Sequence, residues 1–146
     1  MHSKDKGSLG QLKVAADLIS QGYSVFTELG DNCKTDLVII DRKSYKTYKV
    51  QVKARCSKNG SVSIKTTKSG PNYQFAYEEK HADIYAIYIL DKDKIFYVSN
   101  SEFLLHHTMM TFRLALSKNG QEKGCNFVEK YYCIKNAIGL VSEKSE

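Results

Sequence analysis

The segment from Tyr48 to Arg55 alternates strictly between apolar and polar side chains, and this pattern constrains the fold more than any other in the chain. A period of two predicts a half-buried β-strand with one face on the core. The inner face would carry Tyr48, Val50, Val52 and Ala54, and the outer face Lys49, Gln51, Lys53 and Arg55. Because the apolar run Leu37–Ile40 lies one turn upstream, we expect the two segments to pair as antiparallel strands.

Asp36 stands at the head of the apolar run. If the two strands pair, Asp36 meets Gln51 and Lys53 on one face of the sheet. A carboxylate, an amide oxygen and an ammonium group in one place suit a hard divalent cation, a scissile phosphate and an attacking water. Taken singly, each residue is more often an ordinary polar group on a strand surface. Taken together, the three define a candidate site.

Basic residues are concentrated in one part of the chain. The net charge is +6, and residues 42–77 hold nine Lys or Arg residues without a single Asp or Glu. Tyrosine and phenylalanine side chains are interleaved with them. This combination indicates phosphate contacts with stacking or packing aromatics, so we expect a nucleic acid as a partner. The alternative is a solvated strand surface whose tyrosines pack on the core.

A second strand is predicted after the hairpin signal Asn59–Gly60, because residues 61–68 alternate again. Together with the strand before it, this segment would form a basic antiparallel ribbon that fits the DNA major groove. An ordinary edge hairpin is the alternative. The residues expected to contact DNA are Lys49, Arg55, Lys58, Lys65, Thr67 and Lys68.

A helix is predicted from Ser8, as its N-cap, to about Gln21. At 100° per residue its apolar stripe has Gln11 and Leu18 on the margin. Gln11 would then be either a solvated surface residue or a side chain that looks over the rim of the sheet toward Asp36. The centre of the stripe would be formed by Leu12, Ala15, Ala16 and Ile19.

The remaining pattern completes an α/β fold, an α+β mixed sheet in a single domain of residues 1–146. Further strands are expected at Tyr23–Glu28, Asp83–Leu90 and Ile95–Val98, with a helix behind Ser101 and an ambiguous element at Phe127–Ile134. The chain shows no signal peptide and no apolar run near the roughly 18 residues of a membrane helix, so we expect a soluble cytoplasmic protein that does not contact membranes.

Asp36 is followed, after fourteen intervening residues, by Gln51-Val52-Lys53. This arrangement resembles the core motif of the PD-(D/E)XK nucleases, with Gln51 at the position of the second acid. The resemblance implies a restriction-endonuclease-like fold, in which helices flank a central mixed β-sheet with a basic β-hairpin. It implies Mg²⁺, or Ca²⁺ or Mn²⁺ as substitutes, bound by Asp36, Gln51 and the backbone carbonyl of Val52. Lys53 would activate or orient water.

The segment Gly7–Ala15 resembles the first-helix motif G-x-x-G-E-x-x-V-A of the Holliday junction resolvase branch and of related intron homing endonucleases. In those proteins the glutamate belongs to the active site, whereas this chain has Gln11. The implied catalytic set is therefore Gln11, Asp36, Gln51 and Lys53. We interpret the chain as an inactivated form of an enzyme with Glu at position 11, and the alternative is that the natural protein tolerates an amide.

A compact chain with this motif and a basic hairpin resembles the cyanobacterial intron homing endonucleases. The resemblance implies double-stranded DNA as the partner and cleavage of both strands of a long, pseudo-palindromic duplex site. One active site per subunit then implies a homo-oligomer, either a dimer or a tetramer. Two alternatives stay open: a Holliday junction resolvase-type nuclease, and a non-catalytic nucleic-acid-binding module with a nuclease-like fold.

Overall fold

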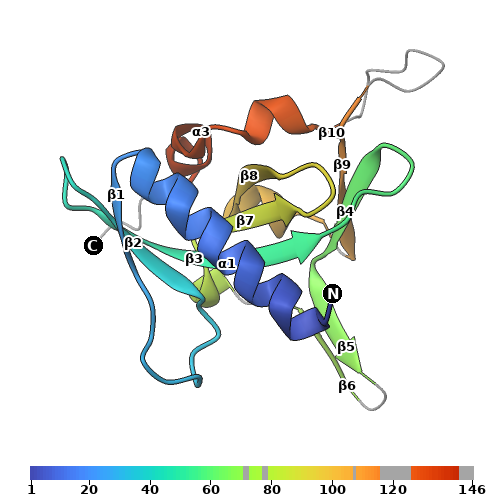
Figure 1. The fold of residues 1–146 in the computed structure, drawn as a ribbon, viewed down its shortest axis with the longest axis horizontal. Helices are drawn as coiled ribbons and strands as arrows, with labels where there is room; N and C mark the ends of the chain where they lie inside the picture. Colours follow the sequence, from blue (N-terminus) through green and yellow to red (C-terminus); the bar gives the residue numbers. More distant parts are fainter. Residues whose placement is uncertain (71–72, 77–78, 107, 116–125, 142–146) are drawn as a thin grey trace.

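The computed structural model describes residues 1–70, 73–76, 79–106, 108–115 and 126–141 of the 146-residue chain. Its centre is a five-stranded mixed sheet in the order β1-β2-β3-β7-β8, with helices packed on it (Figure 1). The mixed α/β architecture expected from the sequence is confirmed. The strands of the central sheet are β1 (Tyr23–Phe26), β2 (Leu37–Asp41), β3 (Thr47–Arg55), β7 (Ile84–Ile89) and β8 (Lys94–Ser99).

Two smaller sheets flank the central one, a three-stranded sheet β10-β9-β4 and a two-stranded ribbon β5-β6. Their strands are β4 (Ser61–Lys65), β5 (Thr67–Gly70), β6 (Tyr73–Ala76), β9 (Met109–Arg113) and β10 (Asn126–Phe127). The helices are α1 (Ser3–Ser20), α2 (Asn100–Phe103) and α3 (Ile134–Gly139), with short 3₁₀ helices η1 (Glu79–His81) and η2 (Val128–Tyr131). No helix in the described part of the chain is long and apolar enough to cross a membrane.

Strand β3 organises the central sheet, because it runs antiparallel to β2 and parallel to β7. Every residue of β7 is buried, as its continuous apolar sequence predicts. Alternate residues of β7 face two separate hydrophobic cores. One core lies beneath α1, and the other lies beneath the three-stranded sheet β10-β9-β4. The first core includes Val14, Leu18, Val50, Ile84 and Ala86, and the second includes Val62, Tyr85, Ile87, Met110 and Phe112.

Helix α1 differs from the prediction in its start and in its buried face. It begins at Ser3, and the capping residue is His2 rather than Ser8. Its buried residues are Gly10, Val14 and Leu18. The stripe predicted around Leu12 and Ile19 is wrong, since these side chains are 70 % and 55 % exposed.

Gly10 explains which face of α1 is buried. A Cβ atom at this position would lie 3.0 Å from the Cβ of Ala54 and 3.7 Å from Cγ1 of Val52. Without a side chain at residue 10, the helix lies directly on β3. The residues four and eight positions later, Val14 and Leu18, then face the sheet as well, because they follow the same row of the helix surface.

The ribbon predicted around Asn59–Gly60 is wrong in its pairing. The turn itself forms, with φ angles of 52° at Asn59 and 74° at Gly60. A hydrogen bond of 2.8 Å from the Lys58 N–H to the Ser61 carbonyl closes it. Beyond that single bridge the strands separate, and β4 pairs with β9. Val62 and Ile64 lie opposite Phe112 and Met110, so burial against a distant strand outweighs the local hairpin.

The two-stranded ribbon of the protein is formed instead by β5 and β6, in the register Thr67↔Ala76 to Gly70↔Tyr73. Residues 61–68 therefore divide between two sheets, with buried Thr66 at the junction. The cap of α2 is Ser99 rather than Ser101. The ambiguous segment at 127–134 contains the end of β10, η2 and the start of α3.

The two glycines of α1 give a matched test of the close approach between α1 and β3. Gly7→Ala is expected to raise the free energy of unfolding by about 0.5–1 kcal/mol, because nothing lies within 4 Å of the added Cβ and alanine favours the helix. Gly10→Ala is expected to lower it by about 1 kcal/mol through overpacking against Ala54. Urea unfolding of both variants measures the difference, and equal stabilisation would contradict the packing argument.

Candidate active site

Asp36 is held at the point where β2 begins. Its Oδ2 atom accepts a hydrogen bond of 2.7 Å from the Val52 N–H of β3. The β2–β3 register pairs Leu37 with Val50, so one residue earlier Asp36 lies opposite Gln51. The carboxylate therefore takes the place of a backbone acceptor where β2 has not yet started. This contact brings the predicted acid to the strand that carries the other predicted residues.

Strand β3 carries three further groups of the predicted site, namely the Val52 carbonyl and the side chains of Gln51 and Lys53. The N–H and C=O of one strand residue point to the same side, so the Val52 carbonyl points toward the side of β3 on which Asp36 lies. Gln51 and Lys53 share the polar face of β3 by their alternate spacing. Lys53 is only 7 % exposed, which is unusual for lysine.

Burial, a hydrogen bond and neighbouring charges shift the pKa of the Asp36 carboxyl in opposing directions. Burial raises the pKa of the Asp36 carboxyl above its ordinary value, while the hydrogen bond from Val52 and the positive charge of Lys53 lower it in part. The negative charge of Asp31 raises the pKa further. Asp36 and Lys53 are therefore close enough to interact electrostatically, as the sequence pattern predicts.

Gln11 reaches the same place from α1. Its Nε2 atom donates a hydrogen bond of 3.3 Å to the backbone carbonyl of Asp36. Of the two placements considered for this side chain, the one directed toward Asp36 is confirmed. The adjacent Gly10 makes this reach possible, because it lets α1 lie directly on β3.

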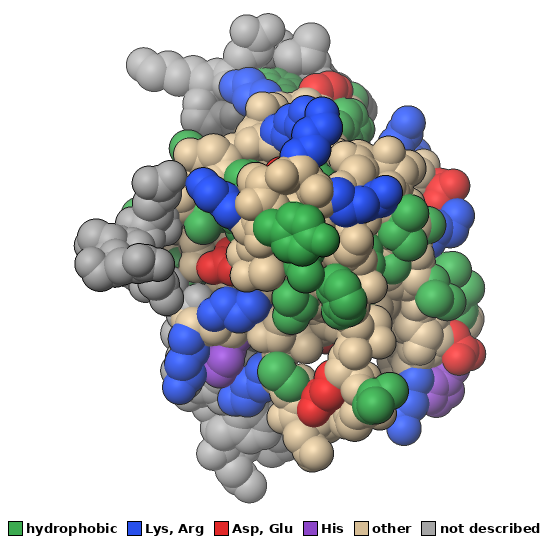
Figure 2. Space-filling view, turned by 90° about the vertical axis from the view of Figure 1, so that its left-hand side faces the viewer, with side chains coloured by type: hydrophobic (Ala, Val, Ile, Leu, Met, Phe, Trp, Pro, Cys, Tyr) green, Lys and Arg blue, Asp and Glu red, His purple; other side chains and the backbone are tan. Residues whose placement is uncertain are grey.

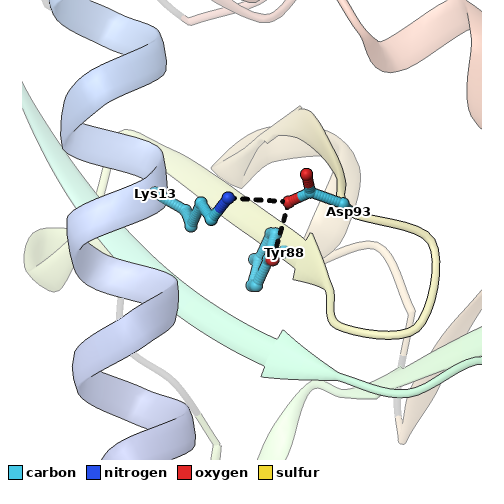
Figure 3. A network of polar contacts seen from close by, with 3 residues as sticks. All are labelled: Lys13, Tyr88 and Asp93. Atoms are coloured by element: carbon cyan, nitrogen blue, oxygen red, sulfur yellow. Dashed lines mark hydrogen bonds and ion pairs between the residues drawn. The ribbon is translucent and has the colours of Figure 1, made fainter.

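A polar network fixes α1 to the turn between β7 and β8. Lys13 Nζ lies 3.1 Å from Asp93 Oδ1, and the Tyr88 hydroxyl donates to the same oxygen at 2.7 Å (Figure 3). Both partners of the ion pair are substantially exposed, so the pair itself contributes little stability. Because Tyr88 is buried, the network adds a fixed contact two residues from Gln11.

A hollow of about 180 Å³ lies between α1, Asp36 and the loop that joins β1 to β2. It includes two carboxylates, Glu28 and Asp31, that were not assigned to the site from the sequence, where the loop reads only as a turn. The one available signal was that both acids fall within the eight residues before Asp36. The lining residues are Gln11, Thr27, Glu28, Gly30, Asp31, Cys33, Thr35 and Asp36.

The predicted DNA contacts lie on several elements. Lys49 is half-buried and its ammonium group donates to the Lys80 carbonyl. Arg55, Lys58 and Lys65 are exposed. Thr67 and Lys68 belong to β5, but their side chains lie outside the described residues. Contact of these six residues with DNA stays a prediction.

The oxygen donors near Asp36 fit a hard divalent cation. In the described ranges no group of three or more His, Cys, Asp or Glu side chains is placed to hold a metal ion. A cation here would therefore depend on mixed donors, namely the Asp36 carboxylate, the Val52 carbonyl and the amide oxygen of Gln51. An oxygen-only set of this kind suits Mg²⁺ rather than zinc or copper.

An acid at the start of one strand, a lysine on its neighbour and a helix packed over a mixed sheet are typical of the metal-dependent nucleases. The chain belongs to the PD-(D/E)XK endonuclease family, whose sequence model matches residues 1–134. Nucleases of this family act on DNA and generally use divalent metals, commonly Mg²⁺.

The fold is also similar to that of a solved structure, the bacterial homing endonuclease I-Ssp6803I. The TM-score is 0.75 at 19 % sequence identity, and the match covers 99 % of this chain and 100 % of the other. No curated protein matches the sequence.

The electrostatics of Asp36 predict a measurable titration in the metal-free protein. The Val52 amide should shift with a midpoint above the ordinary pKa of aspartate, because burial disfavours the charged carboxylate. Below that midpoint Asp36 loses the charge that a cation requires. Two-dimensional ¹H–¹⁵N NMR across the acid range measures it.

Lys53→Met is expected to raise the midpoint further, since the variant removes a positive charge that favours the carboxylate. Lys135→Met, at an exposed position of α3, is the control and should leave the midpoint unchanged. A midpoint at or below the ordinary value, or one that falls in the Lys53 variant, would contradict the assigned environment.

Proposed function

We propose that the protein is a site-specific DNA endonuclease of the homing type, a single nuclease domain. It would hydrolyse both strands of a long, pseudo-palindromic duplex site with Mg²⁺, for which Ca²⁺ or Mn²⁺ can substitute in binding. The observation that carries the proposal is the hydrogen bond from Val52 to Asp36, which fixes a carboxylate against the strand bearing Gln51 and Lys53. The similarity in fold to I-Ssp6803I supports the homing type.

The proposed residue roles follow from the needs of phosphodiester hydrolysis. A divalent cation held by Asp36, Gln51 and the Val52 carbonyl would neutralise phosphate charge and lower the pKa of a water molecule. Lys53 would contact the phosphate or the attacking water, and its positive charge lowers the cost of a negative nucleophile beside DNA. Asp36 has to be ionised in this arrangement, so activity should fall as it becomes protonated.

The basic part of the chain supports a duplex substrate. Residues 42–77 carry nine Lys or Arg residues and no acid, and three of the proposed contacts, Arg55, Lys58 and Lys65, are exposed. The β5–β6 ribbon projects from the body of the molecule (Figure 1). Two-stranded ribbons fit the major groove, so this ribbon replaces the predicted β3–β4 hairpin as the proposed reading element.

Cutting both strands requires two active sites, so the proposal includes a homo-oligomer, a dimer or a tetramer. The β1 edge of the sheet offers apolar surface for contacts between subunits. Phe26 and Val38, partners in the β1–β2 register, are 51 % and 38 % exposed. Figure 2 views this side and shows exposed apolar side chains near its centre with Lys and Arg side chains around them.

Gln11 is proposed to impair cleavage, because it leaves an amide where the related first-helix motif has an acid. Gln11→Glu should raise the rate of Mg²⁺-dependent cleavage at least tenfold, as expected for restoring a group that acts on the reacting centre. Ala16→Glu adds the same charge to an exposed position of the same helix and is the control. Equal rates for the original chain and the Gln11 variant would contradict the proposed impairment.

The first-helix motif also favours a second candidate, a Holliday junction resolvase-type nuclease. Digestion of a random-sequence duplex library and of a four-way junction, both with the Gln11→Glu form, separates the two. We expect a small set of duplex sequences to be cut and the junction to be cut no faster than a duplex of unselected sequence. Junction-selective cleavage without sequence preference would contradict the homing assignment.

A third candidate, a nucleic-acid-binding module without catalysis, is favoured by the amides at positions 11 and 51. The same digestion tests it, with Lys53→Met in the Gln11→Glu background as the inactive reference. Binding of duplex DNA without any cleavage above that reference would support the module and contradict the enzyme.

A further inference from the structure

The loop that joins β1 to β2 adds two carboxylates to the hollow at Asp36. Glu28 and Asp31 both line this hollow of about 180 Å³ together with Gln11 and Asp36. In Figure 1 the loop extends beyond the lower edge of the central sheet between the two strands. Neither acid belongs to the residue set proposed above, so each needs a physical explanation.

The Glu28 carboxylate holds the loop itself. Its Oε2 atom accepts hydrogen bonds from the backbone N–H groups of Asn32 at 3.2 Å and Cys33 at 2.9 Å. These two bonds close the segment 28–33 on itself. At the other end of the loop, Thr35 Oγ1 donates to the His81 carbonyl at 2.6 Å. Asp31 is therefore carried by a loop that is fixed at two points.

Asp31 is exposed, as Glu28 is, and lines the same hollow as Asp36. The two acids differ in that the Glu28 carboxylate is hydrogen-bonded to the backbone of its own loop. Its negative charge is one of the causes that raise the pKa of the Asp36 carboxyl, so the two acids lie within electrostatic range of each other. Like charges that share a hollow repel each other. A divalent cation between them would convert this repulsion into attraction.

The net charge of the proposed catalytic set explains why a second acid beside Asp36 would favour cation binding. Gln11 and Gln51 are neutral, so the set contains one carboxylate, Asp36, and one ammonium, Lys53, with a net charge of zero. A divalent cation gains affinity with each added carboxylate ligand. Asp31 would bring the charge of the site to −1.

We propose that Asp31 is a second carboxylate ligand of the divalent cation at Asp36, supplying the negative charge that Gln11 lacks, with Glu28 as the residue that positions its loop. This inference rests on the proposed function, because it assumes that Asp36 binds a cation. It adds a residue that lies outside the motif of Asp36, Gln51 and Lys53.

Mn²⁺ binding to the metal-free protein tests the inference without any measurement of cleavage. Calorimetric titration of Asp31→Asn should show affinity at least about tenfold weaker than that of the original chain. Glu129→Gln, which removes one negative charge from exposed η2, should bind as the original chain does. In the original chain paramagnetic Mn²⁺ should broaden the NMR signal of the Val52 amide, which marks the site.

The double variant Gln11→Glu/Asp31→Asn tests the charge argument directly. A carboxylate from α1 should replace the one lost from the loop, so Mn²⁺ affinity should return to within about threefold of the original value. Unchanged affinity in Asp31→Asn, with binding lost in Asp36→Asn, would overturn the role of Asp31 and leave the proposed function standing. Absence of Mn²⁺ binding near Val52 in the original chain would overturn both.

Discussion

The hydrogen bond from the Val52 N–H to the Asp36 carboxylate is the interaction on which the site depends. It uses a carboxylate to continue the β2–β3 ladder where the backbone of β2 has not begun. Asp36 is thereby fixed to β3, the middle strand of the sheet. Gln51 and Lys53 belong to β3 itself, so no loop is needed to position them. A strand-borne site of this kind holds its geometry as firmly as the sheet holds its register.

Packing of α1 against the same strand is the second requirement. Gly10 permits the close contact with Ala54, and this contact brings Gln11 to the backbone of Asp36. The glycine of the first-helix motif thus has a structural reason that is independent of catalysis. The next residue, Gln11, reaches Asp36 because the helix approaches so closely. An added methyl group at position 10 should therefore affect both the packing of α1 and the position of Gln11.

The sequence predicts the parts of the protein that depend on local periodicity. The β2–β3 pair and the buried strand β7 follow from alternation and from a continuous apolar run. For Gln11 the sequence leaves two placements open, and the hydrogen bond to the Asp36 carbonyl decides between them. The buried face of α1 does not follow from the sequence pattern. An apolar stripe is located from large apolar side chains, whereas here the absence of a side chain at Gly10 decides which face of the helix lies on the sheet. The pairing of β4 with β9 depends on residues about fifty positions apart, and the acids of the β1–β2 loop carry no periodic signal.

The chain is a member of the PD-(D/E)XK endonuclease family. The oxygen donors around Asp36 and the long basic segment fit the proposed metal-dependent cleavage of DNA, in which Asp31 is proposed to add the carboxylate that the neutral amides of the site do not supply. The most direct test is the anomalous scattering of Mn²⁺ in crystals of the protein with duplex DNA. The account predicts a peak bound by the Asp36 carboxylate and the Val52 carbonyl beside a backbone phosphate. A bound duplex whose phosphates lie far from Asp36, or a peak on other residues alone, would contradict it.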